Sequence, residues 1–325
     1  MSKASIVCIV ALVTSSGGVG CSRAPAYGAA PVASALAQFD AQKGSLPEGL
    51  AIRGANAYVG FAPTSQIMEV NVATGSATPY STLPTPVSGK GFMTGLAFYG
   101  TSLYAGLVSF VPEVQAGIYR ATAPGKPAVL YAKHREMAFP NGLAFDSSGR
   151  LYVADSAAGA VFRVSSSGEA TKWSAGPLLA GNKDYCGPGK GVGVPFDIGA
   201  NGIVLKEDAA YVTNTDKASV VRIPILADGS AGPAQTFAGP NCEDLGGADG
   251  IALDPLGNLV VADNHLDKIV RIDASGQVVT VVRSQPLDFP ASVAFDGRTL
   301  YATNFAFLRA STGKAHPGLV RVDGY

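Results

Sequence analysis

A short motif returns six times along this chain: a variable residue, a small residue and then an apolar strand. The steps from one variable residue to the next are 46, 47, 60, 48 and 42 residues. Sequence periods of this size, combined with strand content, are typical of propellers and other repeat arrays. The variable residues are Glu48, Thr94, Asn141, Asn201, Asp249 and Ala291.

The third copy shows how each repeat continues. Its first strand ends at Phe145, an Asp-Ser-Ser-Gly turn covers 146–149, and a second strand covers 150–155. Asp, Ser and Gly are the residues that tight hairpin turns favour. Further apolar strands follow in the other copies, without sustained helical periodicity. Four strands repeated six times predict an all-β fold, a six-bladed β-propeller of four-stranded antiparallel blades, over residues 45–325. Residues 40–46 are expected to add a strand to the last blade and close the ring.

Residues 1–20 have the pattern of a signal peptide. Lys3 supplies a positive charge, and the apolar run over 4–13 is too short to span a bilayer. The ending Gly18-Val19-Gly20-Cys21 resembles a bacterial lipobox, in which the Cys becomes the lipidated first residue of the mature protein. Plain secretion with cleavage near Gly20 is the alternative. Residues 21–44 are rich in Ala, Pro and Ser and predict a flexible tether.

Charge limits the partners that the chain can bind. It has 24 Lys and Arg against 24 Asp and Glu. Nucleic-acid binding depends on clustered positive charge, so the sequence argues against it. We expect a monomer that binds a small-molecule substrate and meets a membrane only through an N-terminal lipid anchor. The signal predicts export, to the periplasm or outer membrane as a lipoprotein, or otherwise by secretion.

Two cysteines remain once the signal peptide and Cys21 are set aside. Cys186 and Cys242 lie in the loops that enter the fourth and fifth copies of the motif, on the same face of the predicted ring. In an oxidising compartment this placement predicts a disulfide. Two buried free thiols are the alternative.

The ring positions carry the chemistry. In a propeller the first strand of each blade lines the central channel, so equivalent positions face one another. Four of the six variable residues, Glu48, Asn141, Asn201 and Asp249, are oxygen ligands for a hard cation. Two carboxylates and two amide carbonyls suit Ca²⁺, with Zn²⁺, Mn²⁺ and Mg²⁺ as alternatives. Taken singly, each is also a common turn residue before a strand.

Further polar residues end several second strands, and their side chains are expected either to bond the loop backbone or to face the channel. They are Asp155, Asn214, Asp263 and Asn304. Apolar residues just before the ring positions are expected to form a collar around the charged centre, with packing between blades as the alternative for each. They are Phe92, Met93, Phe139, Phe196 and Phe289.

The mature chain resembles the gluconolactonase, senescence marker protein and luciferin-regenerating enzyme family of six-bladed propellers. The resemblance rests on Pro47-Glu48-Gly49, Asn141-Gly142, Asn201-Gly202 and Ala248-Asp249-Gly250. It implies that Glu48, Asn201 and Asp249 bind a divalent cation, and that Asn141 binds substrate or completes the metal shell. Paraoxonases and strictosidine-synthase-like propellers share the architecture and are close alternatives.

The chain departs from the pattern of that family at a position that contacts substrate. Sugar lactonases of this kind carry an arginine two residues before the third-copy asparagine, where this chain has Phe139. The resemblance therefore gives no support for an aldonolactone and suggests a more apolar substrate.

These features predict a divalent-metal-dependent hydrolase of lactones or related esters, with the metal at the centre of the propeller. The cation would stabilise the charge that develops on the carbonyl oxygen. The resemblance gives Asp249 the role of catalytic base, and His265 is the reserve candidate. Asn141, Phe139 and His265 are the predicted substrate contacts. The alternative is a non-catalytic exported propeller that binds a small ligand or an envelope partner and holds a structural cation.

Overall fold

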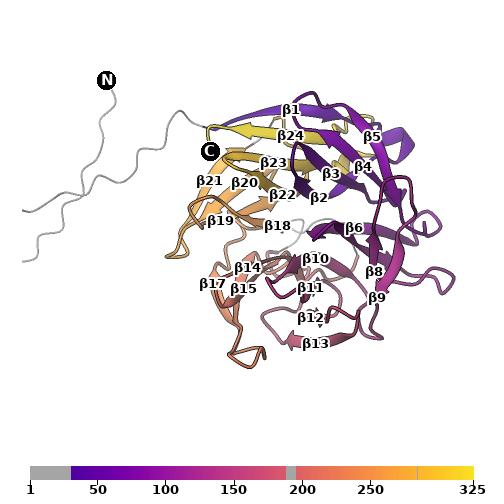
Figure 1. The fold of residues 1–325 in the computed structure, drawn as a ribbon. Helices are drawn as coiled ribbons and strands as arrows, with labels where there is room; N and C mark the ends of the chain where they lie inside the picture. Colours follow the sequence, from indigo (N-terminus) through magenta and orange to yellow (C-terminus); the bar gives the residue numbers. More distant parts are fainter. Residues whose placement is uncertain (1–30, 188–194, 284) are drawn as a thin grey trace, which may run out of the picture.

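The computed structural model describes residues 31–187, 195–283 and 285–325. Six four-stranded antiparallel sheets are arranged around a central axis, as blades of a propeller (Figure 1). The all-β six-bladed fold predicted from the repeats is confirmed. The signal peptide and the lipidation candidate Cys21 lie outside the described residues.

The strands follow chain order within each blade, from the axis outward. Blades 1 and 2 contain β2 (Pro47–Arg53), β3 (Asn56–Phe61), β4 (Gln66–Asn71), β5 (Ala77–Thr82), β6 (Gly91–Tyr99), β7 (Ser102–Ser109), β8 (Gly117–Ala121) and β9 (Val129–Ala132). Blades 3 and 4 contain β10 (Pro140–Phe145), β11 (Leu151–Asp155), β12 (Ala160–Val164), β13 (Ala170–Ala175), β14 (Ala200–Lys206), β15 (Ala209–Asn214), β16 (Ser219–Pro224) and β17 (Gln235–Ala238). Blade 5 contains β18 (Ala248–Leu253), β19 (Leu259–Asp263), β20 (Lys268–Ile272) and β21 (Val278–Arg283).

Blade 6 closes the ring with a strand from the other end of the chain. It contains β22 (Pro290–Asp296), β23 (Thr299–Asn304), β24 (Gly318–Asp323) and, outermost, β1 (Val32–Gln38). β1 pairs with β24 in antiparallel register, and the two lie side by side in Figure 1.

The position of β1 corrects two expectations from the sequence. The closing strand is 32–38 and not 40–46, and the propeller begins inside the segment 21–44 that was expected to be a tether. Ala41–Lys43 forms a short 3₁₀ turn instead, capped by Asp40. An outermost strand has neighbours on one side only, so Val32–Gln38 can be Ala- and Ser-rich and still pair through its backbone.

Each pair of neighbouring blades shares one apolar core. The six hydrophobic clusters fall between successive sheets around the ring, and the sixth joins blade 6 to blade 1 through Tyr301, Leu319, Leu50 and Val59. A single blade would leave both faces of its sheet exposed, so each blade depends on both neighbours for burial.

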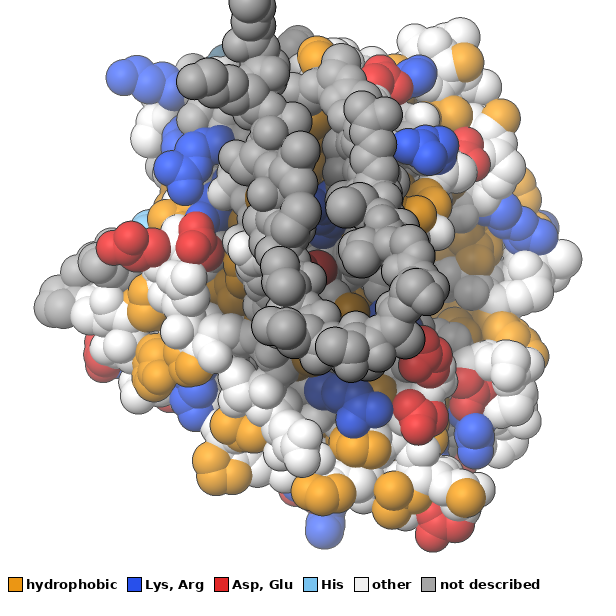
Figure 2. Space-filling view, turned by 90° about the vertical axis from the view of Figure 1, so that its left-hand side faces the viewer, with side chains coloured by type: hydrophobic (Ala, Val, Ile, Leu, Met, Phe, Trp, Pro, Cys, Tyr) orange, Lys and Arg blue, Asp and Glu red, His pale blue; other side chains and the backbone are white. Residues whose placement is uncertain are grey.

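The outer surface mixes both signs of charge. In Figure 2, outside the part covered by grey atoms, Lys and Arg side chains are interspersed with Asp and Glu, and neither sign forms a continuous patch. No helix among the described residues is both long enough and apolar enough to cross a membrane.

The glycines of the repeat are required by the close approach of the inner strands. A Cβ atom added at the motif glycine of blades 1 to 5 would lie 2.6 Å or less from a backbone carbonyl oxygen of the next blade. In each case that carbonyl belongs to the variable residue of the next copy. The five glycines are Gly49, Gly95, Gly142, Gly202 and Gly250. Only glycine fits at so short a distance, which explains the small residue in the motif.

Cys186 and Cys242 form the predicted disulfide, which confirms the pairing. The bond joins the loop that enters blade 4 to the loop that enters blade 5, across 56 positions of sequence. Both cysteines also pack against the core cluster between these blades.

We expect the double variant Cys186→Ser/Cys242→Ser to lose about 4 kcal/mol in free energy of unfolding, because the crosslink no longer restricts the unfolded chain. Urea denaturation of oxidised protein and variant measures the difference, and reduced wild type should match the variant. Equal stability of the oxidised protein and the variant would show that the loop closure contributes nothing.

Candidate functional site

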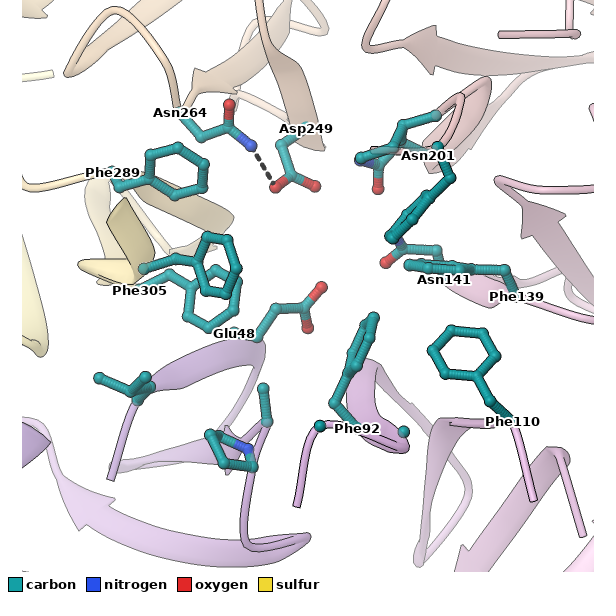
Figure 3. A pocket seen from close by; sticks show the side chains of 18 of the residues that line it. Glu48, Phe92, Phe110, Phe139, Asn141, Asn201, Asp249, Asn264, Phe289 and Phe305 are labelled. Atoms are coloured by element: carbon teal, nitrogen blue, oxygen red, sulfur yellow. Dashed lines mark hydrogen bonds between the residues drawn. The ribbon is translucent and has the colours of Figure 1, made fainter. Parts of the chain in front are cut away.

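A cavity of about 450 Å³ opens at the axis of the propeller and is lined by all four predicted ring residues. Glu48, Asn141, Asn201 and Asp249 come from β2, β10, β14 and β18, and each is at most 7% exposed. Figure 3 shows their polar ends directed into one common space. The predicted convergence of four blades on one point is therefore what the structure shows.

A bulge in each blade positions the ring residue. The pairing between first and second strands shifts register at the motif, for example between Pro140 and Leu143 in blade 3 and between Ala248 and Ile251 in blade 5. The same shift recurs in the other four blades. A bulge re-aims one side chain away from the regular alternation of a strand, so the ring residue points to the axis.

Hydroxyl groups fix the orientation of the two asparagine amides. Asn201 Nδ2 donates to Thr215 Oγ1 at 2.8 Å, and Thr215 Oγ1 donates to the carbonyl of Ala248 at 2.8 Å. A hydroxyl has one hydrogen, so Thr215 must accept from the amide nitrogen, which leaves Asn201 Oδ1 to face the cavity.

Blade 3 repeats this arrangement. Asn141 Nδ2 donates to Ser156 Oγ at 3.3 Å, and Ser156 Oγ donates to the carbonyl of Ala200 at 3.0 Å. The Asn141 amide oxygen therefore points away from Ser156, just as the Asn201 amide oxygen points away from Thr215 in blade 4. Figure 3 shows the oxygens of both amides facing the central space, and the Asn201 amide also donates a hydrogen bond to the Asp249 carboxylate.

The two carboxylates are less fully paired. Asp249 Oδ2 accepts one hydrogen bond, from Asn264 Nδ2 at 3.0 Å. Burial raises the pKa of Asp249 to about 7, against the lowering effect of hydrogen bonds from Asn264 and Asn201. Burial first, and then the nearby charge of Asp249, raises the pKa of Glu48 well above its ordinary value. Two carboxyl groups are thus held together in a space where ionisation is costly.

The donor set fits a hard divalent cation. Glu48 Oε2 and Asn201 Oδ1 are buried and have no hydrogen-bond partner. Among the described residues no group of three or more His, Cys, Asp or Glu side chains could hold a metal ion, so a site here must also use the amide oxygens. Carboxylate and amide oxygens around unpaired negative charge are the ligands that Ca²⁺ takes.

The other two ring positions do not complete the donor set. Thr94 Oγ1 donates to the carbonyl of Pro140 at 2.7 Å and is directed to the next blade. Ala291 is buried and has no polar side-chain atom. The oxygen ligands therefore come from blades 1, 3, 4 and 5, and blade 6 presents a carbon surface.

Three of the four polar residues that end the second strands hold loops, and none of the four lines the cavity. Asp155 accepts from the backbone nitrogens of Phe139 and Ala158. Asn214 and Asn304 bond loop backbone in the same way. Asp263 is buried opposite Lys268 in the β19–β20 pair. These side chains were expected either to bond the loop backbone or to face the channel, and Asp155, Asn214 and Asn304 bond the loop backbone.

Aromatic rings surround the opening in two groups. The first aromatic wall consists of Phe92, Phe110, Phe139 and Phe196, whose successive ring contacts have centroid distances of 5.2 to 6.4 Å. The second aromatic wall consists of Phe289, Phe305 and Phe307, with centroid distances of 5.3 to 6.1 Å. All seven line the cavity.

Four of the five predicted collar residues line the cavity, and Met93 does not. Met93 is fully buried in the core between blades 1 and 2. His265 is also not among the lining residues, so the structure gives no support for a substrate contact or a base there. His265 and Asn264 both lie in the turn that follows β19.

Sequence reasoning missed several residues of the cavity, among them one asparagine and three phenylalanines: Asn264, Phe110, Phe305 and Phe307. Asn264 and Phe305 lie one residue beyond the second strands β19 and β23. The ring residues and these positions are 14 or 15 residues apart, as in the pairs Asn141–Ser156 and Asn201–Thr215. That constant spacing was the signal available in the sequence.

Two protein families match parts of the chain. Residues 197–306 match the family described as SMP-30/Gluconolactonase/LRE-like region. Residues 137–163 match the NHL repeat. No curated protein shows significant sequence similarity to the chain.

Solved structures share the fold at low sequence identity. A luciferin-regenerating enzyme has 16% identity and a TM-score of 0.60, with 90% of this chain and 95% of that chain covered. A calcium-binding protein, regucalcin from Agrobacterium tumefaciens, has 18% identity and a TM-score of 0.55, with 86% and 92% covered. Virginiamycin B lyase from Staphylococcus aureus has 17% identity and a TM-score of 0.53, with 84% and 82% covered. The family match confirms, over residues 197–306, the resemblance to the gluconolactonase, senescence marker protein and luciferin-regenerating enzyme family that the motifs predict.

Proposed function

We propose that this protein is a divalent-metal-dependent hydrolase of lactones or related esters, with the cation at the axis of the propeller. The observation that carries the proposal is the cluster of buried oxygens with no internal partner, above all Glu48 Oε2 and Asn201 Oδ1. Buried polar atoms in a folded protein nearly always have a hydrogen-bond partner. The lack of a partner for these two oxygens therefore favours a bound ligand. The family match over residues 197–306 supports a lactonase-like propeller.

Glu48, Asn141, Asn201 and Asp249 would hold the cation, and Ca²⁺ suits them best. When bound, such a cation supplies positive charge against the carbonyl oxygen of a substrate and lowers the barrier to attack by water. Thr215 and Ser156 keep the two amide oxygens directed inward. The phenylalanine collar keeps bulk water away from the carbonyl carbon.

Asp249 is our candidate for moving the proton. Hydrolysis joins the oxygen of water to the carbonyl carbon, breaks the acyl–oxygen bond and places a proton on the leaving oxygen. Asn264 uses Asp249 Oδ2, so Oδ1 is the oxygen that can accept the proton from the attacking water. The same carboxyl group can then donate that proton to the leaving oxygen, which gives one hydroxy acid per lactone.

We also propose that the protein is exported and acts as a monomer on a small molecule. The disulfide Cys186–Cys242 is consistent with an oxidising compartment. The lipid anchor at Cys21 remains part of this proposal, as do the expectations of no nucleic-acid partner and of membrane contact only through that anchor.

Asp249→Asn tests the assignment of the base and ligand. Asparagine keeps the shape of the side chain but has no charge and accepts no proton, so hydrolysis of a lactone panel should fall at least about 100-fold. The measurement is the initial rate of acid release with added Ca²⁺, and with chelator as the metal-free reference. Asp296→Asn, at the exposed end of β22, is the matched control.

The result separates an enzyme from a binding protein. Turnover in the wild type that chelator removes supports the hydrolase. Unchanged turnover in Asp249→Asn would overturn the assignment of Asp249. Calcium binding without turnover of any lactone or ester would instead favour the non-catalytic propeller with a structural cation.

Glu48→Gln should have opposite effects on stability with and without metal. In chelator the variant should gain about 1 kcal/mol in free energy of unfolding, since one buried carboxyl group is no longer placed against another. With Ca²⁺ it should lose the stabilisation that wild type shows, because a ligand charge is missing. Thermal unfolding in both conditions measures this, and an equal calcium response in the two proteins would contradict a metal site at Glu48.

Thr215→Val tests the orientation of the Asn201 amide. Valine matches threonine in shape but cannot accept from Asn201 Nδ2, so the amide is free to flip and calcium affinity should fall roughly tenfold. Thr215→Ser keeps the hydroxyl and is the matched control. Calorimetric titration with Ca²⁺ gives the affinities, and equal values for the two variants would show that Thr215 does not orient the ligand.

A further inference from the structure

We infer that the site takes neutral lactones or esters that carry an apolar group, and that this group lies between the two aromatic walls. The inference rests on the proposed function for the reacting carbonyl. The walls themselves are a property of the cavity, so binding can be tested separately from hydrolysis.

The walls stand on opposite sides of the oxygen cluster. Figure 3 shows Phe92, Phe110 and Phe139 on one side, Phe289 and Phe305 on the other, and the Glu48 and Asp249 carboxylates between them. The first wall comes from blades 2 and 3 and the loop that enters blade 4, and the second from blade 6. A ligand with its carbonyl at the oxygen cluster would therefore place its substituent against phenylalanine rings.

Blade 6 provides the surface for that substituent. Blades 3, 4 and 5 place a polar pair at the ring: Asn141–Ser156, Asn201–Thr215 and Asp249–Asn264. Blade 6 has Ala291 and Phe305 at the same two positions. Alanine leaves room at the axis and phenylalanine offers a ring face, so this sector of the channel is apolar where its neighbours bind a cation.

The second wall is held in place before any ligand arrives. Asp267 Oδ1 accepts from the backbone nitrogen of Phe289 at 2.7 Å, and Asp267 Oδ2 pairs with Arg309 at 2.6 Å. Arg309 also pairs with Asp288. Arg309 ends the 3₁₀ turn Phe307–Arg309, so the same ion pairs fix Phe289 and Phe307. A preformed wall reduces the entropy lost when a ligand is ordered.

Charge and size agree with a neutral, apolar substituent. None of the lining side chains in the described part of the chain is Lys, Arg or His, and two are carboxylates. A carboxylate or phosphate on the substituent would have no cationic partner there, and a sugar would leave most of its hydroxyl groups facing phenylalanine rings. The cavity of about 450 Å³ is within the range of small-molecule sites.

A matched pair of δ-lactones tests the inference. δ-Decalactone and D-glucono-δ-lactone share the reactive ring, but one carries an alkyl chain and the other carries hydroxyl groups. We expect wild-type protein in chelator to bind δ-decalactone at least roughly tenfold more tightly, as measured by titration calorimetry. Equal affinities, or a preference for the gluconolactone, would overturn the inference.

Phe305→Ala locates the substituent. The variant should bind δ-decalactone roughly tenfold more weakly, with no change for the gluconolactone. Phe237→Ala is the control: Phe237 is also half-buried, but it lies in β17, the outermost strand of blade 4, and packs on Tyr211. Phe92→Ala in the first wall gives an independent reading if Phe305→Ala folds poorly. Unchanged affinity in both wall variants would overturn the inference.

The two proposals fail in different ways. Selective binding of δ-decalactone without chelator-sensitive hydrolysis would support the apolar site between the two aromatic walls and overturn the proposed hydrolase activity. Chelator-sensitive hydrolysis of both lactones at equal kcat/KM would support the hydrolase and would show that the two aromatic walls do not determine its specificity.

Discussion

The fold and the site both depend on how closely neighbouring inner strands approach each other. In blades 1 to 5 the motif glycine lies against the carbonyl oxygen of the next blade's variable residue, with no room for a Cβ atom. Any side chain there would push two blades apart, and the shared cores between blades would open with them. The same contact fixes the backbone of the ring residue. A constraint that closes the propeller therefore also fixes the backbone position of Asn141, Asn201 and Asp249.

Hydroxyl groups of Thr and Ser side chains add hydrogen bonds between blades next to the oxygen ligands. Thr213 Oγ1 donates to the carbonyl of Asp249 at 2.6 Å, and Thr303 Oγ1 donates to the carbonyl of Glu48 at 2.9 Å. Each of these bonds joins two blades at a ring residue. Thr215 and Ser156 also join two blades, at the residue before the ring position, and each orients an amide. Because the ligands are held by contacts that the ring needs in any case, the oxygen cluster can be preformed without a ligand.

The sequence predicts those parts of the structure that repeat. The motif period gives the blades, and equivalence around an axis brings the four oxygen ligands together. The disulfide follows from two loops on one face. The closing strand Val32–Gln38 has no such signal, because an outermost strand needs little apolar burial. Phe305 and Phe307 escape prediction because their place at the cavity depends on how β23 ends. His265 was assigned from its position in the sequence, while the orientation of its side chain depends on the turn between β19 and β20.

The uncompensated charge is the main physical reason to assign chemistry to this propeller. A luciferin-regenerating enzyme, a regucalcin and a lyase have similar folds, so the fold alone does not select a reaction. Here, two buried carboxyl groups with raised pKa values stand beside amide oxygens that hydroxyl groups turn toward them. Such a cluster lowers the stability of the empty protein. A cation would offset that cost, and the phenylalanine walls around it would increase its effect by excluding water from the charges. The oxygen cluster and the aromatic walls therefore act together. The cluster would bind the cation that polarises a carbonyl group, and the walls would determine which carbonyl compounds reach it.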